Sequence, residues 1–326
     1  MKDTARLVGG GRLEFTTPNA LFLSSRHTTH STDQDPIAGV LFRDKSQFAV
    51  LAGTKPMYLH YWGVDRSPFE VGSNQAIFYR GASHDEALAR IDFLSSHKRR
   101  LGLLLGESGI GKSLTLQVAA RSLRRAGKVV VLLDPTGASP AKLYWQLASQ
   151  LGISSVAEDD LLQLWSRIAD RVHENRLQQL DMVLLVDNAG AATPEAMMEI
   201  LRLSQIDPQL DARWTTVLAT SPAEARLWSE SLFEQIDLRI NLERWDESET
   251  AGFVQIALVE AGRRTPVFEE AALSTLHNLS KGLPRHIVRL ADFSMLASAA
   301  AELEIIGAET VQRAHREVTQ MTTVAV

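Results

Sequence analysis

The sequence has no cysteine among its 326 residues. This absence excludes a disulfide scaffold, a cysteine nucleophile, and any zinc or iron–sulfur site built on thiolates. Long hydrophobic runs are also missing, and without about 18 consecutive apolar residues we expect no membrane span. The N-terminus has no apolar segment behind a basic start, so we expect no signal peptide and a cytoplasmic protein.

Neither sign of charge dominates the composition. The net charge is −5, with 22% charged and 45% hydrophobic residues, as in ordinary globular proteins. A nucleic-acid contact would therefore need a local basic cluster, although such clusters are more often solvated surface. The candidates are Lys98-Arg99-Arg100, the group Arg121, Arg124 and Arg125, and Arg263-Arg264.

The chain is long enough for about two domains and an additional arm. Residues 1–60 contain Gly9-Gly10-Gly11, Ser/Thr clusters and little hydrophobic periodicity, so we predict an N-terminal arm that is partly disordered. Residues 61–245 alternate apolar runs with helical segments, which predicts an α/β domain whose parallel sheet is covered on both faces. The predicted strands are Leu101–Leu105, Val129–Leu133, Met182–Val186, Thr216–Ala219 and Leu238–Leu242.

Residues 246–326 show helical patterns only, which predicts a second, all-helical domain. Its predicted helices are Glu247–Ala261, Phe268–Ser280, Pro284–Ala301 and Ala308–Thr319. Before the sheet, Ser83 with Glu86 three residues later predicts a capping box at a helix start. Gly152 and Gly262 are placed to end helices.

One motif identifies a phosphate-binding loop. The segment Gly106-Glu107-Ser108-Gly109-Ile110-Gly111-Lys112-Ser113 matches G-x-x-x-x-G-K-[ST], follows a predicted strand and opens a helix that ends at about Arg125. Glycines let backbone N–H groups turn toward phosphate oxygens, and the helix N-terminus favours negative charge. We expect nucleotide contacts from Gly106 through Leu114. Lys112 would contact the β- and γ-phosphates of ATP, and Ser113 would bind Mg²⁺.

A second Mg²⁺ ligand is expected at the end of the strand Met182–Val186. Asp187 follows this apolar strand directly, and ligands of open α/β sheets bind at that edge. Many P-loop ATPases place a glutamate next, as the base for the attacking water, but this chain has Asn188. An amide can hold water but cannot accept its proton, and loss of a general base costs about 10²–10⁴-fold in rate. Either hydrolysis is slow and the protein is a switch, or another carboxylate such as Glu195 substitutes.

Several segments around the loop resemble the AAA+ ATPases of the ExeA type, which are linked to general secretion in bacteria. The module is also similar to the transposition regulators TniB, TnsC and MuB. The resemblance covers residues 61–320. It rests on Pro68-Phe69, Phe78-Tyr79-Arg80, the run from Ser83 to Arg90, Val131 to Pro135 with Leu151-Gly152, Glu234 to Leu242, and Gly282-Leu283-Pro284-Arg285.

The resemblance implies a P-loop NTPase αβα sandwich with strand order 5-1-4-3-2 and a C-terminal helical lid. It places Ser221 at the sensor-1 position, although Ser221 could equally cap the helix that begins at Pro222. It places Arg285 at the sensor-2 position, in reach of the γ-phosphate, against the alternative of a surface arginine.

The same resemblance suggests an arginine finger and an adenine wall. Arg239 would reach the γ-phosphate of a neighbouring subunit, which implies a homo-oligomer; the family often has an earlier arginine where Gln235 stands, so a structural role on the strand stays open. Ile77, Phe78 and Tyr79 would line adenine, or else form ordinary core.

The favoured function is an ATPase that uses ATP·Mg²⁺ to switch or remodel an assembly with an unknown protein partner. A DNA-binding ATP switch of the transposition-regulator type and an ATP-binding scaffold without turnover are the alternatives. A small-molecule kinase is least supported, because the C-terminal domain is helical and no acceptor site is evident.

Overall fold

The computed structural model describes residues 55–69, 78–154, 160–209 and 211–323. Most of the expected arm, residues 1–60, lies outside this part of the chain, as does Ile77. The first described helix, α2 (Lys55–Trp62), begins inside the segment expected to form the arm. In the described residues, no helix combines the length and the apolar character that a membrane crossing requires.

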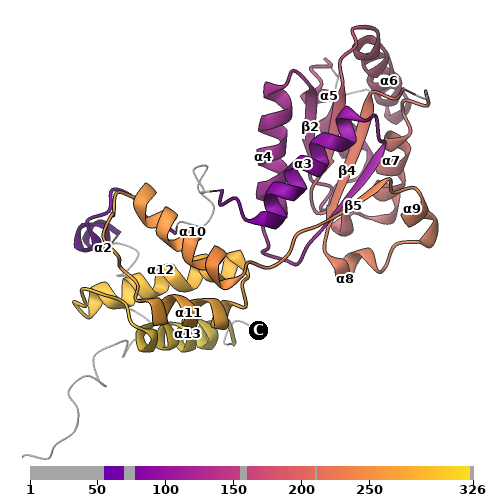
Figure 1. The fold of residues 1–326 in the computed structure, drawn as a ribbon. Helices are drawn as coiled ribbons and strands as arrows, with labels where there is room; N and C mark the ends of the chain where they lie inside the picture. Colours follow the sequence, from indigo (N-terminus) through magenta and orange to yellow (C-terminus); the bar gives the residue numbers. More distant parts are fainter. Residues whose placement is uncertain (1–54, 70–77, 155–159, 210, 324–326) are drawn as a thin grey trace, which may run out of the picture. The chain divides into compact units, whose positions relative to one another are not determined.

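Five parallel strands form the central sheet (Figure 1). They are β1 (Leu101–Leu105), β2 (Val129–Leu133), β3 (Met182–Val186), β4 (Trp214–Thr220) and β5 (Leu238–Asn241). Their order is β2-β3-β4-β1-β5, which confirms the predicted 5-1-4-3-2 arrangement. Because β4 pairs with both β1 and β3, its carboxyl end lies between those of its two neighbours.

Helices cover both faces of the sheet. On one face lie α3 (Ala82–Ser96) and α4 (Lys112–Arg125), and on the other α5 (Pro140–Gln150), α6 (Leu161–Leu177) and α7 (Pro194–Ser204) (Figure 1). Leu103 packs with the second group and Leu104 with the first, because successive strand side chains point to opposite faces. This double burial explains why the strands read as continuous apolar runs.

Short helices follow β3 and β4, and longer helices that share one hydrophobic core follow the last strand, β5. The short ones are η1 (Ala189–Ala191), α8 (Pro222–Ala225) and α9 (Glu230–Glu234). The C-terminal helices are α10 (Glu247–Glu260), α11 (Glu270–Ser280), α12 (Pro284–Ala300) and α13 (Ala308–Thr323). Trp62 and Phe69, which precede the sheet, are buried in the core of these helices. Division of the chain after residues 60 and 245 stays a prediction.

The start of α3 differs from the predicted capping box at Ser83. The helix begins at Ala82 and its N-cap is Gly81, which has no side chain to donate or accept. Instead, the Ala82 amide donates to Glu249 Oε1 of α10 at 2.8 Å. A carboxylate 167 residues away in the chain therefore satisfies this helix end, which a local pattern cannot reveal.

A glycine permits the close approach between the end of the sheet and α12. Gly282 has φ +69°, and a Cβ there would lie 2.2 Å from the Trp245 carbonyl oxygen. The Trp245 amide donates to the Gly282 carbonyl at 3.0 Å. The backbone can come this close only because residue 282 lacks a side chain.

We predict that Gly282→Ala destabilises the protein more than Gly127→Ala. Gly127 also has positive φ, +82°, but nothing lies within 4 Å of a Cβ placed there. Gly127→Ala should therefore lower the free energy of unfolding by only about 1–2 kcal/mol, the strain of the left-handed region. Gly282→Ala should cost about 1–3 kcal/mol more, the usual range for overpacking. Urea unfolding measures both, and equal losses would contradict the close approach.

Candidate nucleotide-binding site

The phosphate-binding loop connects β1 to α4, as predicted. Gly109 and Gly111 have φ +85° and +110°, conformations that other residues rarely adopt. Gly111 is the N-cap of α4, and no described side chain caps this helix. The first amides of α4 are therefore available to an anion, where the helix dipole also favours negative charge.

The side chain of Lys112 is hydrogen-bonded to the backbone of the loop. Its Nζ donates to the carbonyls of Gly106 at 2.8 Å and Glu107 at 3.1 Å. Partial burial lowers the pKa of Lys112, while Asp187 and Glu224 act in the opposite direction. The ammonium thus lies within electrostatic range of both carboxylates at the sheet edge.

The residues present fit a magnesium ion. Asp187 directly follows β3, and its amide donates to the Leu133 carbonyl at 2.8 Å. Ser113 is exposed in the first turn of α4. Among the described residues, no group of three or more His, Cys, Asp or Glu side chains could hold a metal ion. A Mg²⁺ that accompanies a nucleotide needs none, because it uses one or two protein oxygens together with phosphates and water.

Asn188, which follows β3, is hydrogen-bonded to a carboxylate that follows the neighbouring strand β2. It has φ +50°, and its Nδ2 donates to Asp134 Oδ2 at 3.0 Å. Burial alone would raise the pKa of Asp134, but hydrogen bonds from Thr136 and Asn188 outweigh it and lower the pKa. Asp134 was not predicted, although it follows β2 just as Asp187 follows β3.

Ser221 and Arg239 both make the structural contacts that were weighed as alternatives. Ser221 Oγ accepts from the Glu224 amide at 3.2 Å, which caps α8. Arg239 lies on β5 with its guanidinium 4.9 Å from the centre of the Phe233 ring. Neither contact excludes a role with nucleotide, so the sensor and finger assignments stay predictions.

Arg285 comes from the start of α12 and lies against the loop. Its amide donates to the Gly109 carbonyl at 3.2 Å, and a Cβ at Gly109 would lie 2.9 Å from the Arg285 Cβ. The positive charge of Arg285 contributes to the lowered pKa of Lys112. The helical region therefore presents an arginine at the phosphate loop, while its sensor-2 role toward a γ-phosphate stays a prediction.

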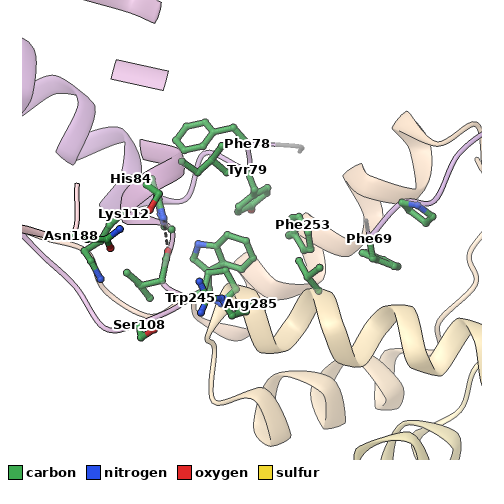
Figure 2. Close-up of a pocket in the computed structure, with 18 residues that line it drawn as sticks. Phe69, Phe78, Tyr79, His84, Ser108, Lys112, Asn188, Trp245, Phe253 and Arg285 are labelled. Atoms are coloured by element: carbon green, nitrogen blue, oxygen red, sulfur yellow. Dashed lines mark hydrogen bonds between the residues drawn. The ribbon is translucent and has the colours of Figure 1, made fainter. Parts of the chain in front are cut away.

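An aromatic pocket of about 310 Å³ adjoins the loop (Figure 2). Phe78 and Tyr79, the expected adenine wall, line it. Trp245 and Phe253 line it too, with ring centres 5.0 Å apart, and Trp245 lies 5.2 Å from Tyr79. These two were not predicted, although Trp245 stands just after the last strand. Apolar walls beside a polar loop are typical of ligand pockets.

The side chain of His84 is hydrogen-bonded to the backbone of the phosphate-binding loop. It is buried, and its Nε2 lies 3.0 Å from the Ile110 carbonyl oxygen, so Nε2 carries the donated hydrogen. Burial lowers the pKa of His84 below its ordinary value of 6.5, against the opposing charges of Glu249 and Asp85. The folded protein therefore holds His84 neutral.

We predict that His84→Gln weakens the loss of stability in acid. A depressed folded-state pKa means that the unfolded chain binds the proton first, so stability falls as the pH drops below about 6.5. Glutamine keeps a donor for Ile110 but cannot titrate. Urea unfolding at about pH 7.5 and about pH 5.5 should show a smaller difference for His84→Gln than for wild type. His97→Gln, at an exposed position, is the control and should behave like wild type.

Comparisons with known proteins agree with this geometry. Residues 95–227 match a family model described as an AAA domain. General secretion pathway protein A of Aeromonas hydrophila is 25% identical over 248 residues, which cover 75% of this chain and 45% of that protein. The chain thus spans about half the length of this relative.

Solved structures share the fold. Cdc6p from Pyrobaculum aerophilum has a TM-score of 0.63 at 19% identity, covering 78% of this chain and 71% of its own. The Drosophila ORC structure bound to DNA has a TM-score of 0.63 at 16% identity, covering 90% and 71%. Residues 95–227 therefore resemble an AAA domain in sequence, the described fold is that of a P-loop NTPase αβα sandwich, and the chain is similar in sequence to General secretion pathway protein A.

Proposed function

We propose that this protein binds ATP with Mg²⁺ and hydrolyses it slowly to switch or remodel a partner assembly. The observation that carries the proposal is the contact of Arg285 with Gly109. It brings a cation of the helical region to the loop that would hold the phosphates. A γ-phosphate would add a charge-assisted contact to Arg285, so its loss would change how the helical region is held.

The proposed roles follow the contacts. Backbone amides of the loop and Lys112 would bind the phosphates, while Ser113 and Asp187 would hold Mg²⁺, which neutralises phosphate charge when bound. The aromatic pocket would take the adenine ring, with Phe78 and Tyr79 on one side. A homo-oligomer in the cytoplasm is part of the proposal, because Arg239 would act on a neighbour's nucleotide.

Lys112→Ala should abolish turnover and weaken ATP binding about 10- to 100-fold, the effect of one hydrogen bond to a charged group. Steady-state phosphate release measures turnover, and titration with a fluorescent ATP analogue measures binding. Wild-type turnover no faster than that of Lys112→Ala would contradict hydrolysis and favour a scaffold.

The same assay tests assembly. Wild-type turnover per subunit should rise with protein concentration, because an arginine finger requires a neighbour. Arg239→Ala should lose this rise while still binding ATP. A rate per subunit that does not change with concentration would contradict a shared site.

A DNA-binding ATP switch is the second candidate, since structures of similar fold include Aeropyrum pernix ORC1 in complex with DNA. The predicted basic clusters are partly engaged within the protein: Lys98 pairs with Asp181, Arg124 donates to the Val130 carbonyl and Arg263 donates to the Trp62 carbonyl. Arg121 and Arg125 on α4 are exposed.

If DNA binds there, each of Arg121 and Arg125 would contact one phosphate. Replacing both with alanine should therefore lower the magnitude of the slope of the logarithm of the binding constant against the logarithm of the salt concentration by about two. Fluorescence anisotropy with a labelled duplex, over a salt series and with ATP present, measures it. Absence of binding at low salt would exclude this candidate.

A further inference from the structure

The proposed hydrolysis lacks an obvious proton acceptor, and the further inference rests on that proposed function. Asn188 cannot accept a proton, and its amide already donates to Asp134. Among the carboxylates that follow the strands at this edge, the candidates compared are Asp134, Glu195 and Glu224. Their surroundings differ enough to distinguish them.

Glu195 and Asp134 are poorly placed. Glu195 is exposed in the first turn of α7. Asp134 has both oxygens engaged, since Oδ1 accepts from the Thr136 amide at 2.9 Å and hydroxyl at 2.6 Å, and Oδ2 accepts from Asn188. It also follows β2, the strand farthest from β1 on that side of the sheet.

Glu224 has one anchored oxygen and one available. Its Oε2 accepts from Thr220 Oγ1 at 3.0 Å, the Ser221 amide at 3.0 Å and Ser221 Oγ at 2.7 Å. No described residue donates a hydrogen bond to Oε1. Three donors on one oxygen fix the direction of the carboxylate and leave the other oxygen to accept from a water.

Thr220, one of the donors to Glu224 Oε2, is also hydrogen-bonded to the phosphate loop. Thr220 is the register partner of Leu105, and its carbonyl accepts from the Gly106 amide at 3.3 Å. The Gly106 carbonyl in turn accepts from Lys112. Hydrogen bonds from Ser221, and then the charge of Lys112, lower the pKa of Glu224, so the group is an anion at neutral pH.

Glu224 also touches the turn that follows Asp187. A Cβ at Gly190 would lie 2.5 Å from the Glu224 Cβ and 2.4 Å from Thr220 Oγ1. Only glycine allows this approach between η1 and α8. Glu224 therefore lies against the turn that carries Asp187 and Asn188, and its hydrogen-bond donor Thr220 is joined to the phosphate loop.

We propose that Glu224 is the catalytic carboxylate that orients the attacking water, the role that Asn188 cannot fill. The water oxygen bonds to the γ-phosphorus while the bond from phosphorus to the β,γ-bridging oxygen breaks. ADP leaves with that electron pair. The proton of the water passes to Glu224 Oε1 and then to solvent, which yields ADP and inorganic phosphate.

Glu224→Gln separates catalysis from helix capping. Glutamine also serves at this capping-box position, so the thermal unfolding midpoint should fall only slightly, through loss of the charge, and ATP affinity should stay close to that of wild type. Because an amide cannot accept the proton, turnover should fall about 10²- to 10⁴-fold. Asp134→Asn is the matched control: it removes the same charge at the end of β2, which is separated from β4 by β3, and should change turnover only a few-fold.

A binding measurement provides a second readout. ADP with aluminium fluoride imitates the phosphoryl group in transit, so Glu224→Gln should bind it at least about tenfold more weakly while binding ADP alone normally. Turnover equal to wild type, or a parallel loss of ADP affinity, would overturn the assignment to Glu224. A larger loss in Asp134→Asn would transfer the role to Asp134. Absence of wild-type turnover is a different result, since it refutes the proposed hydrolysis together with this step.

Discussion

The pairing of β4 with β1 is the constraint on which the site depends. It aligns Thr220 with Leu105 and joins Thr220 to Gly106 by a hydrogen bond. The turn after β4 is thereby fixed beside the phosphate loop, and β3 brings Asp187 to the same edge. Because all five strands are parallel, each delivers its following residues to one side of the sheet.

Local patterns predicted the elements that depend on nearby residues. The first three strands have the predicted bounds, and α4 begins and ends where the loop motif and helical pattern placed it. Strong apolar runs and proline or glycine boundaries determine such elements almost alone. The strand order came from family resemblance, since alternation of strands and helices specifies a parallel sheet but not which strands are neighbours.

Contacts between distant residues were beyond sequence reasoning. The cap of α3 comes from Glu249, so the local Ser83 pattern gave the wrong start. The bond from Asn188 to Asp134 joins residues 54 positions apart, and the Trp245 carbonyl lies so close to residue 282 that only glycine fits there. The local sequence identifies Glu224 only as a helix-capping residue. Its contact with Gly190, in the turn after Asp187, is visible only in the structure.

The links between the loop and the helical region indicate how nucleotide state could be transmitted. The Arg285 amide bonds Gly109, and Arg244, which precedes Trp245, pairs with Glu107 through contacts of 3.0 and 2.6 Å. The pair of Arg244 and Glu107 is half-exposed, so its value lies in orientation more than in energy. Arg244 approaches from the end of β5 and Arg285 from α12, so the two contacts reach the loop from opposite ends of the α10–α11 segment. A change in the loop that disturbs either contact would alter how these helices are held, which is what a nucleotide-dependent switch requires.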